Sequence, residues 1–439
     1  MSKIVVKNLT KIFGSNPERG VRRLKAGATK AQVQKELGLV VGVHDVSFAV
    51  EEGETFVVMG LSGSGKSTLL RCLNRLHEPT AGSIEVDGVD ITKLGRRELL
   101  QVRRRKFGMV FQNFALLPHR TVLGNTEYGL EVQGVPASER RQKALDAIEL
   151  VGLKGWEDRY PSELSGGMQQ RVGLARALAI DPDVLLMDEA FSALDPLIRR
   201  EMQDEMLELQ ARMNKTIVFI THDLDEALKL GDRIAVMRDG EIIQLGTPEE
   251  IVSSPADDYV AAFTEGVDRS KVLTAASIMQ RPKEVATLRD GPQIVLRKLR
   301  QNGLSSIFLV DRERRIVGLL EADAVAKLVR EGGTDLKEAL SPTFPAIGKE
   351  TPLREVMEFS AGVSGPIAVV DEAARLVGVI VKGAILAALV QHGENGGTTD
   401  GIHEAVDVNG VVAGRDDGAE NDGDAAVSLG DAGKGGTTL

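Results

Sequence analysis

A glycine-rich loop between an apolar run and a helical pattern is the first feature of the sequence that could carry chemistry. The segment TFVVMGLSGSGKSTLL fits the spacing G-x-x-x-x-G-K-[ST], with Gly60, Gly65, Lys66 and Ser67 at the fixed positions. Glycines let backbone N–H groups close around phosphates, the lysine reaches the β- and γ-phosphates, and the serine hydroxyl faces Mg²⁺. The pattern therefore predicts a loop that binds ATP and Mg²⁺, whose other members are Ser62, Gly63, Ser64 and Thr68.

Two adjacent carboxylates end a second apolar run, DVLLMDEAFSALD at 183–195. Its four consecutive apolar residues predict a central parallel strand, and Asp188 and Glu189 stand at the carboxyl end, where α/β sheets bind their ligands. We expect Asp188 to hold Mg²⁺, mostly through water, and Glu189 to orient or deprotonate an attacking water. The alternative for Asp188 is the N-cap of a helix.

Two further polar side chains end apolar runs. FGMVFQ ends at Gln112 and TIVFITH ends at His222. If these strands are parallel, both side chains arrive at the sheet edge that holds the phosphates. We expect Gln112 to sense Mg²⁺ and the attacking water, and His222 to contact the γ-phosphate. With Glu189 they form one catalytic constellation around the phosphate loop.

A second glycine-rich segment, LSGGMQQRVGLARAL at 164–178, begins about a hundred residues after the first. Ser165, Gly166 and Gly167 precede a predicted helix, and a helix N-terminus is a ready seat for an anion. An ordinary N-cap at Ser165 is compatible with the same pattern. One ATP does not need two glycine-rich phosphate-binding segments from the same chain, so the second segment needs another explanation.

The chain that positions these groups has 439 residues, which predicts about three domains. The single cysteine, Cys72, excludes a disulfide framework, fits a reducing compartment and is expected to pack as a small hydrophobe. No apolar signal region opens the chain, and the longest apolar run, 376–390, is too short to span a bilayer and carries Lys382. We therefore expect a cytosolic protein that reaches a membrane through a partner, and the lack of a basic stripe argues against a nucleic-acid partner.

Two copies of one unit follow the catalytic region. IFLVDRERRIVGLL at 307–320 matches IAVVDEAARLVGVI at 367–380 with a constant offset of 60. Each copy predicts strand, turn, strand and helix, so the pair is expected to close its core by pseudo-symmetric packing. After His392, ten acidic and two basic residues contribute −8 to the chain's net charge of −10. This glycine-rich, aromatic-free tail is predicted to be disordered.

These observations predict an α/β catalytic part followed by an α+β pair of modules. The expected division is an ATPase domain at 1–245 with a helical subdomain at about 113–170, a connecting helical segment at 246–272, modules at 273–333 and 334–392, and the tail at 393–439.

One ordered set of motifs resembles the ATPase subunit of an ATP-binding cassette (ABC) transporter over roughly residues 3–245: Gly60–Thr68, Gln112, Leu164–Gln170, Asp188–Glu189, Ser192–Asp195 and His222. The resemblance implies a P-loop NTPase with a RecA-like core and a helical signature subdomain. It implies that two subunits pack head to tail, so that Ser165, Gly166 and Gly167 of one cap the γ-phosphate held by Lys66 of the other. It also implies a nucleotide contact at Asp195.

Longer segments are similar to one branch of that family. MVFQNFALLPHRTVLGNTEYGLE and MDEAFSALDPLIRREMQDEM resemble the ATPases of glycine betaine/proline (quaternary amine) importers, and the repeats resemble cystathionine-β-synthase-type (CBS) modules. The resemblance implies a homodimer that powers osmoprotectant import at the cytoplasmic face of the inner membrane, with a permease and, indirectly, a substrate-binding protein. The permease would contact the Gln112–Val122 region, where we expect exposed apolar residues at Phe114, Leu116, Leu117 and Pro118. A loop folded back on the core is the alternative.

The stretch 14–42 is longer than in simpler importer ATPases. Thr29 and Gln32 fit a capping box and Gly38 fits a helix stop, which predicts a surface helix at 30–37. The family stacks an aromatic residue from the end of the first strand on adenine. Phe13 is the local candidate, and a core phenylalanine is the alternative.

The modules depart from the usual nucleotide-binding pattern, in which Ser or Thr and then Asp follow the glycine. The first copy has Glu321 and Asp323, and the second has Val381 and Gly383. Two roles for the modules therefore stay open: they bind a regulatory nucleotide, or they serve mainly in dimerisation or sensing. The acidic tail is either part of an ionic-strength sensor or a solubilising segment.

A cassette ATPase without a transport role, in DNA repair, chromosome condensation or ribosome release, is the alternative function. Condensation and repair members insert long coiled coils between the two ATP motifs, whereas Lys66 and Asp188 lie only 122 residues apart. Ribosome-associated members usually carry two cassettes, and this sequence has one. We therefore expect a transporter subunit.

Overall fold

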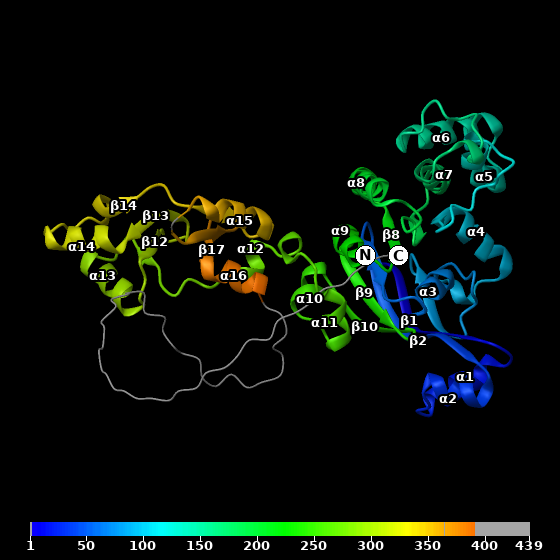
Figure 1. Ribbon diagram of the computed structural model, residues 1–439, viewed down its shortest axis with the longest axis horizontal. Helices are drawn as coiled ribbons and strands as arrows, with labels where there is room; N and C mark the ends of the chain where they lie inside the picture. Colours follow the sequence, from blue (N-terminus) through cyan, green and yellow to red (C-terminus); the bar gives the residue numbers. More distant parts are fainter. Residues whose placement is uncertain (1, 364, 391–439) are drawn as a thin grey trace, which may run out of the picture. The chain divides into compact units, whose positions relative to one another are not determined.

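The computed structural model describes residues 2–363 and 365–390 (Figure 1). The predicted acidic tail at 393–439 lies outside the described residues. Within the described part of the chain, no helix is both long enough and apolar enough to cross a bilayer.

Six strands form the sheet that carries the phosphate loop, in the order β10-β9-β3-β8-β7-β6. Three are buried at every position, as their continuous apolar sequences predict: β3 (Thr55–Met59), β7 (Val184–Asp188) and β8 (Thr216–Thr221). The others are β6 (Phe107–Val110), β9 (Arg233–Arg238) and β10 (Glu241–Gly246). Since all but β10 run parallel, their carboxyl ends meet at one edge, and the predicted α/β fold is confirmed.

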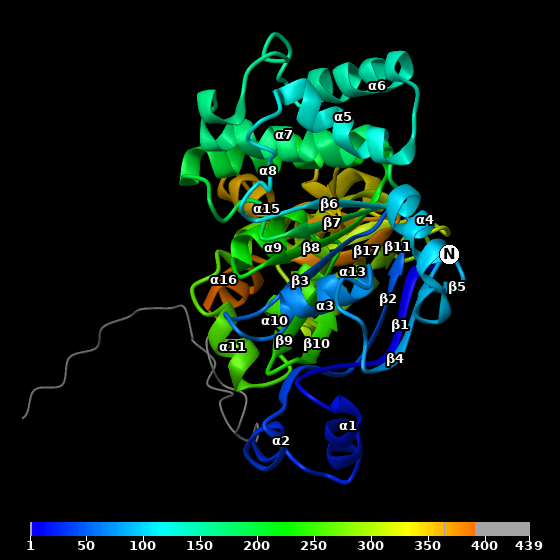
Figure 2. The same ribbon diagram turned by 90° about the vertical axis from the view of Figure 1, so that its right-hand side faces the viewer.

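A second, antiparallel sheet has the order β2-β1-β4-β5 and consists of β1 (Ser2–Phe13), β2 (Val40–Glu51), β4 (Ala81–Val86) and β5 (Val89–Asp90). Its apolar face and one face of α3 (Lys66–Leu73) form a cluster with the six-stranded sheet (Figure 2). Cys72 is fully buried in this cluster, as expected, and burial raises the pKa of its thiol to about 12. The helix that follows the phosphate loop is therefore fixed by packing.

Three helices pack on one another next to the edge of the large sheet (Figure 2): α5 (Val122–Gln133), α6 (Ala137–Leu150) and α7 (Gly166–Ala179). Thr121 starts α5 by accepting a hydrogen bond from the Gly124 amide, and Gly134 ends it in the left-handed region at φ 82°. Further helices are α4 (Arg96–Lys106), α8 (Pro196–Met213) and α9 (Leu224–Leu230).

The insertion between β1 and β2 contains two helices, α1 (Pro17–Lys25) and α2 (Lys30–Leu37), with a small hydrophobic cluster of their own. The predicted helix at 30–37 is confirmed, with the capping box of Thr29 and Gln32 and a left-handed Gly38. The sequence analysis did not predict α1, because Val21 and Leu24 are its only large apolar residues and Gly20 is a weak helix former. A Cβ at Gly20 would lie 2.8 Å from the terminal methyl group of Ile12, so a larger residue there would displace that side chain.

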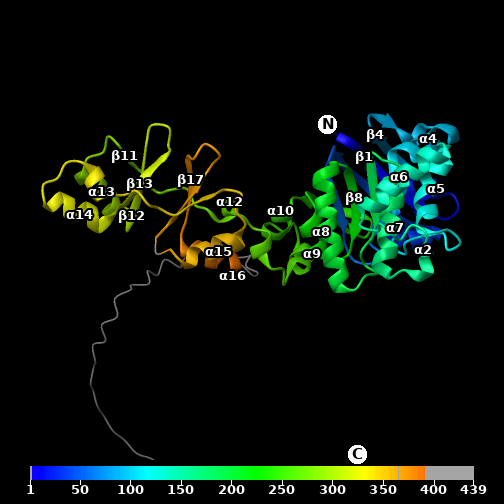
Figure 3. The ribbon, with the colours of Figure 1, turned by 90° about the horizontal axis from the view of Figure 1, so that it is seen from above.

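Two short helices, α10 (Pro248–Ser253) and α11 (Asp258–Thr264), follow the large sheet. The first repeat then contains β11 (Ala286–Thr287), α13 (Pro292–Gln301), β12 (Ser306–Val310), β13 (Ile316–Glu321), α14 (Ala322–Arg330) and β14 (Leu340–Ser341). The second contains β15 (Ala346–Gly348), α15 (Leu353–Ala361), β16 (Ile367–Val370), β17 (Leu376–Ile380) and α16 (Lys382–Val390) (Figure 3).

The two repeats share a core, as their common offset predicts. Phe308 and Leu319 of the first copy form one hydrophobic cluster with Ala368 and Leu376 of the second. The hairpin turns meet in an antiparallel bridge between residues 315 and 375, which are equivalent positions. The short helix α12 (Ala275–Ile278), at the start of the first repeat, packs on α16 and β17 of the second.

Candidate active site

The phosphate loop has a backbone that only glycine permits. Gly60 and Gly65 have φ values of 150° and 103°. A Cβ atom would lie 2.2 Å from the Met237 carbonyl oxygen at Gly60, and 2.3 Å from the Gly42 carbonyl oxygen at Gly65. Leu61, Ser62 and Gly63 are exposed, and Ser64 is buried with a hydroxyl that has no partner among the described residues. An open cradle with an orphan hydroxyl fits a phosphate chain.

Lys66 starts α3 and is only 4% exposed. Its ammonium donates hydrogen bonds of 2.8 Å and 3.1 Å to the Gly60 and Leu61 carbonyl oxygens, and it lies 3.9 Å from Glu189 Oε1. Burial lowers the pKa of Lys66, while Glu189 and Asp188 act in the opposite direction. The lysine is thus held over the loop where it is predicted to bind phosphates.

Asp188 lies 4% exposed at the end of β7 and makes two contacts with α3. Ser67 Oγ donates a 2.9 Å hydrogen bond to its Oδ1, and Arg71 forms an ion pair with Oδ2 at 3.4 Å. No helix begins at Asp188, because Asp195 caps the next helix, so the alternative of an N-cap at Asp188 is wrong. Sequence reasoning missed Arg71, although its i+4 spacing from Ser67 places both on one helix face.

Glu189 follows β7 with a left-handed φ of 46° and collects side chains from the two neighbouring strands. Gln112 Nε2 donates to its Oε2 at 3.1 Å, and His222 Nδ1 lies 3.3 Å from the same oxygen. Gln112 also donates to Ser192 Oγ at 3.3 Å, a partner that was not among the predicted site residues. The structure therefore brings the predicted constellation together, because β6, β7 and β8 are parallel neighbours.

Phe13 ends β1 beside the phosphate-loop helix. A Cβ atom on Gly42 would lie 2.9 Å from the Phe13 ring and 3.1 Å from the Thr68 methyl group, so the ring and Thr68 flank the same glycine. The ring is half-buried, has an edge contact with His77 at 5.3 Å, and belongs to none of the hydrophobic clusters of the described residues. The Lys11 ammonium lies over the ring, 4.9 Å from its centroid, and stacking of Phe13 on adenine stays a prediction.

The second glycine segment stands apart from the first. Ser165 Oγ accepts a 3.4 Å hydrogen bond from the Met168 amide at the start of α7, and Ser165 and Gly166 are exposed. Gly167 must be glycine, since a Cβ would lie 2.7 Å from the Ile198 side chain. Across residues 2–363 and 365–390, no hydrogen bond or ion pair joins 165–167 to the phosphate loop.

Asp195 caps the helix α8 of its own chain. Its Oδ1 accepts hydrogen bonds of 3.1 Å from the Leu197 and Ile198 amides. The structure thus separates Asp195 and the segment 165–167 from the six residues gathered at the sheet edge: Lys66, Ser67, Gln112, Asp188, Glu189 and His222.

The loop after Gln112 differs from expectation. Phe114, Leu116 and Leu117 are half-buried rather than exposed, and the first two pack against the core. Only Pro118 of the four apolar residues is exposed. The expectation of four exposed apolar side chains is therefore wrong, because the chain turns back at Phe114 and Ala115, both at positive φ.

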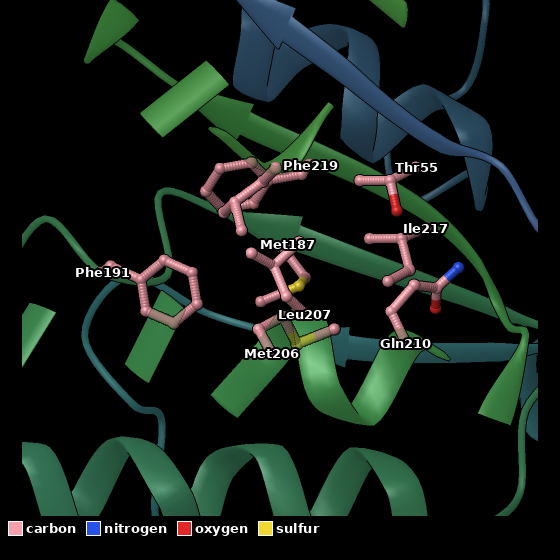
Figure 4. Close-up of a pocket in the computed structure, with 9 residues that line it drawn as sticks. Thr55, Met187, Phe191, Met206, Leu207, Gln210, Ile217 and Phe219 are labelled. Carbon is pink, nitrogen blue, oxygen red and sulfur yellow. The ribbon is translucent and has the colours of Figure 1, made fainter. Parts of the chain in front are cut away.

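A small cavity under the large sheet offers no competing site (Figure 4). It measures about 10 Å³ and is lined by residues that include Met187, Phe191, Met206 and Phe219. This volume holds at most about one water molecule. Its walls are largely apolar, so this cavity is not a second catalytic site.

Known proteins match the part of the chain that carries most of this site. Residues 43–192 match the family model described as ABC transporter. The chain is 55% identical to the glycine betaine/carnitine transport ATP-binding protein of Listeria monocytogenes, over 89% of this chain and 98% of that protein. It is 53% identical to the glycine betaine transport ATP-binding protein of Bacillus subtilis, over 89% and 93%. It is 51% identical to the glycine betaine/proline betaine transport ATP-binding protein of Escherichia coli, over 90% and 99%.

Proposed function

The chain belongs to the family of ABC-transporter ATP-binding subunits and hydrolyses ATP to drive transport, and we propose that the transported solutes are glycine betaine and related quaternary amines. The observation that carries the substrate proposal is identity above 50% along nearly the whole length of three relatives whose names all include glycine betaine. The alignments reach into the repeat modules, so they concern more than the ATPase core.

The substrate class can be tested with the importer reconstituted in vesicles from this subunit, its permease and its binding protein. Labelled glycine betaine should be taken up and should stimulate ATP hydrolysis, whereas a sugar such as maltose should do neither. Proline, carnitine and choline arms define the range. If no quaternary amine is taken up by a complex that still hydrolyses ATP, the proposed substrate class is wrong.

For hydrolysis, we propose that Glu189 deprotonates the attacking water, while Gln112 and His222 orient its Oε2 oxygen. Lys66 binds the β- and γ-phosphates in exchange for the two loop carbonyls it now contacts. Ser67, Asp188 and Gln112 supply oxygen ligands of the kind Mg²⁺ prefers, and bound Mg²⁺ neutralises phosphate charge.

We propose further that two copies close around two ATP molecules, with Ser165, Gly166 and Gly167 of each subunit on the γ-phosphate of the other. Support comes from the exposed N-terminus of α7, whose first amides are available to an anion. We place the dimer at the cytoplasmic face of the inner membrane, held by the permease through 112–122 and indirectly by a substrate-binding protein.

The modules and tail are proposed to regulate transport by ionic strength. Tail charge of −8 is screened over about 8 Å at physiological salt and about 3 Å near 1 M, so its contacts with basic surfaces or anionic lipid weaken as salt rises. We keep the division at 245, 272 and 392 as the working map for truncation; because β14 (Leu340–Ser341) pairs with β13 of the first repeat, the boundary between the modules is moved from 333 to after 341. A regulatory nucleotide at the modules is a separate proposal, and Asp323 is the exposed residue that would serve it.

Vesicles with ATP and varied KCl inside test this regulation. Removal of 393–439 should shift the salt concentration that activates transport, and removal from 273 onward should flatten the dependence while ATPase activity remains. If both truncated subunits keep the parental salt curve, the tail is solubilising and the modules do not gate transport.

A further inference from the structure

Neighbouring residues at the end of β1 have different surroundings. Ile12 is buried in the hydrophobic cluster of the insertion, which also contains Leu39. Lys11 and Phe13, one residue to either side, are half-buried. Residues two apart in a strand share a face, so the side chains of Lys11 and Phe13 are neighbours on the side of β1 opposite to Ile12.

The ammonium of Lys11 has two partners. It lies over the Phe13 ring, 4.9 Å from the ring centroid, where the negative face of the ring attracts a cation. It also donates a 2.9 Å hydrogen bond to the Glu78 carbonyl oxygen. Within residues 2–363 and 365–390, Lys11 forms no ion pair, unlike Lys3 and Lys7 on the same strand. The ring and this carbonyl oxygen therefore stabilise its charge.

Glu78 belongs to a turn, residues 74–80, that begins where α3 ends. Thr80, at the end of this turn, contacts β1 twice. Its amide donates a 2.8 Å hydrogen bond to the Thr10 carbonyl oxygen, and its Oγ1 accepts a 3.0 Å hydrogen bond from the Ile12 amide. The helix of the phosphate loop is thus connected to the end of β1 through one short turn.

The same turn places a second ring beside Phe13. The His77 imidazole stands at 87° to the Phe13 ring, with 5.3 Å between the centroids, and the His77 amide donates a 2.9 Å hydrogen bond to the Arg71 carbonyl oxygen of α3. Burial lowers the pKa of His77, and the charges of Arg71 and Lys11 lower it further. A neutral imidazole can therefore stand close to the Lys11 ammonium without repulsion between like charges.

Two arginines fix the backbone of the turn. Arg75 has a left-handed φ of 54°, and its guanidinium donates hydrogen bonds of 2.6 Å and 2.9 Å to the Ile91 and Leu94 carbonyl oxygens. Arg103, on α4, donates a 2.7 Å hydrogen bond to the Asn74 carbonyl oxygen. A non-glycine residue keeps a left-handed backbone only where its surroundings enforce it. The turn therefore holds the end of β1 in one position.

We infer that Lys11 is a positioning residue for the nucleotide base: it binds one face of the Phe13 ring and leaves the opposite face to adenine, while the turn 74–80 fixes the ring relative to the phosphate loop. The faces of two stacked aromatic rings are both negative, so a cation behind one of them reduces their repulsion. The inference rests on the predicted stacking of Phe13 on adenine and is independent of which solute is transported.

Binding of ADP to the full-length subunit, followed by calorimetry, tests this without hydrolysis or a permease. Lys11→Met keeps a long apolar chain and removes the charge, and it should raise Kd for ADP about fivefold, the effect of losing one cation–π contact. Lys11→Arg should bind ADP within about twofold of the parental subunit, because a guanidinium also binds ring faces. The matched control is Lys7→Met on the same strand, since Lys7 is exposed and pairs with Glu85 at 2.9 Å. It should leave Kd unchanged.

A double-mutant cycle tests whether Lys11 acts through the ring. Phe13→Ala should raise Kd for ADP about tenfold, the effect of losing one stacked base. Adding Lys11→Met to Phe13→Ala should then raise Kd by less than about twofold, because the cation no longer has a ring to bind. Inorganic pyrophosphate, which has no base, should bind all these variants as it binds the parental subunit. If the effects of the two substitutions on Kd multiply, Lys11 acts elsewhere and the inference is wrong.

The remaining outcomes also decide the matter. If Phe13→Ala weakens ADP binding and Lys11→Met does not, the ring stacks without help from the cation and the inference is wrong. If neither substitution changes Kd, the predicted stacking fails and the inference falls with it. If Lys11→Met weakens pyrophosphate as much as ADP, Lys11 supports the fold of the phosphate loop and does not position the base. Failure of the importer to take up glycine betaine would overturn the proposed substrate and leave these binding comparisons unchanged.

Discussion

Two glycine-rich turns at helix N-termini, residues 60–65 before α3 and residues 164–167 before α7, look alike in the sequence and differ in their surroundings. The first is enclosed by groups of its own chain: Lys66 bonds back onto it, and Ser67 pairs with Asp188. In the second, Ser165 and Gly166 are exposed, and Ser165 Oγ accepts one long hydrogen bond from the Met168 amide. The first turn has side chains of its own chain that can hold a ligand, and the second has only exposed backbone and one hydroxyl. Two such turns can bind opposite sides of one ligand.

The cost of leaving the second turn open is small in the free subunit. The first amides of an α-helix have no partner within the helix, and water can satisfy them at an exposed end. The same amides gain more from a phosphate, because the helix dipole and the N–H groups both favour negative charge. The N-terminus of α7 can therefore bind an anion, and that anion is not a phosphate held by the phosphate loop of the same chain.

The largest expected effect tests the enclosed turn. Glu189→Gln should keep ATP binding and lower ATP hydrolysis by about 10²–10⁴-fold, the range for loss of a general base. The amide retains the shape and a carbonyl acceptor for Gln112, so binding at Lys66 should persist. Steady-state ATPase assays and binding of a fluorescent ATP analogue measure the two quantities.

The same variant bears on the open turn. With ATP and Mg²⁺ it should form a stable dimer, visible by light scattering, because trapped ATP keeps both turns on the phosphate. A Glu189→Gln subunit that hydrolyses ATP at the parental rate would exclude the assigned role.

Complementation tests whether the open turn acts across subunits. Lys66→Ala and Ser165→Arg subunits should each be inactive alone. Lys66→Ala lacks the phosphate contact, and the arginine of Ser165→Arg blocks the second glycine-rich turn. In a mixed dimer one site carries both lesions and the other carries neither. Partial ATPase activity should therefore appear on mixing.

The control for this experiment places both lesions in one chain. Lys66→Ala, Ser165→Arg mixed with the parental subunit gives dimers with one lesion at each site, which should be inactive. If each chain completed its own site, the parental half of that dimer would stay active and the two single variants would restore nothing. Once the activity of the parental homodimers is subtracted, the mixed dimers of the two mixtures give opposite results under the two arrangements.

Much of this site follows from sequence because a parallel sheet converts separate strand ends into neighbours. Gln112, Asp188 and His222 each follow an apolar run, and the parallel order β6-β7-β8 brings them together. The capping box at Thr29 and the burial of Cys72 also follow from local chemistry. The capping box depends on residue type and short-range geometry, whereas the other features depend on residue type together with the regular packing of a parallel sheet.

The features that sequence did not predict depend on long-range packing. The turn at Phe114 needs Arg176 from 62 residues away, so no local pattern announces that the loop folds back. The helix α1 is stabilised by contact with Ile12 and Leu39 rather than by its own periodicity. Such elements are fixed by partners that approach only in the folded chain.

Substitution of Phe13, which is predicted to stack on adenine, should have a smaller effect on ATP hydrolysis. Phe13→Ala should raise KM for ATP by about tenfold with little change in kcat, because stacking of a base on an aromatic ring is worth about 1–3 kcal/mol. Phe13→Tyr should preserve the affinity, since it keeps an aromatic ring of nearly the same size. An unchanged KM in Phe13→Ala would show that the ring only packs beside Thr68 and His77.

The smallest effect on stability separates the two roles of Ser165. Its 3.4 Å hydrogen bond to the Met168 amide is a weak helix cap, so Ser165→Ala should cost about 0.5–1 kcal/mol of unfolding free energy. Thr29→Ala removes a comparable cap from α2, on the insertion, and should cost a similar amount. Only Ser165→Ala should also weaken ATP-driven dimerisation, when both are placed on the Glu189→Gln background and followed by light scattering. Equal dimerisation in the two variants would mean that the Ser165 hydroxyl is a cap and nothing more, and that the backbone amides of α7 alone face the partner's ATP.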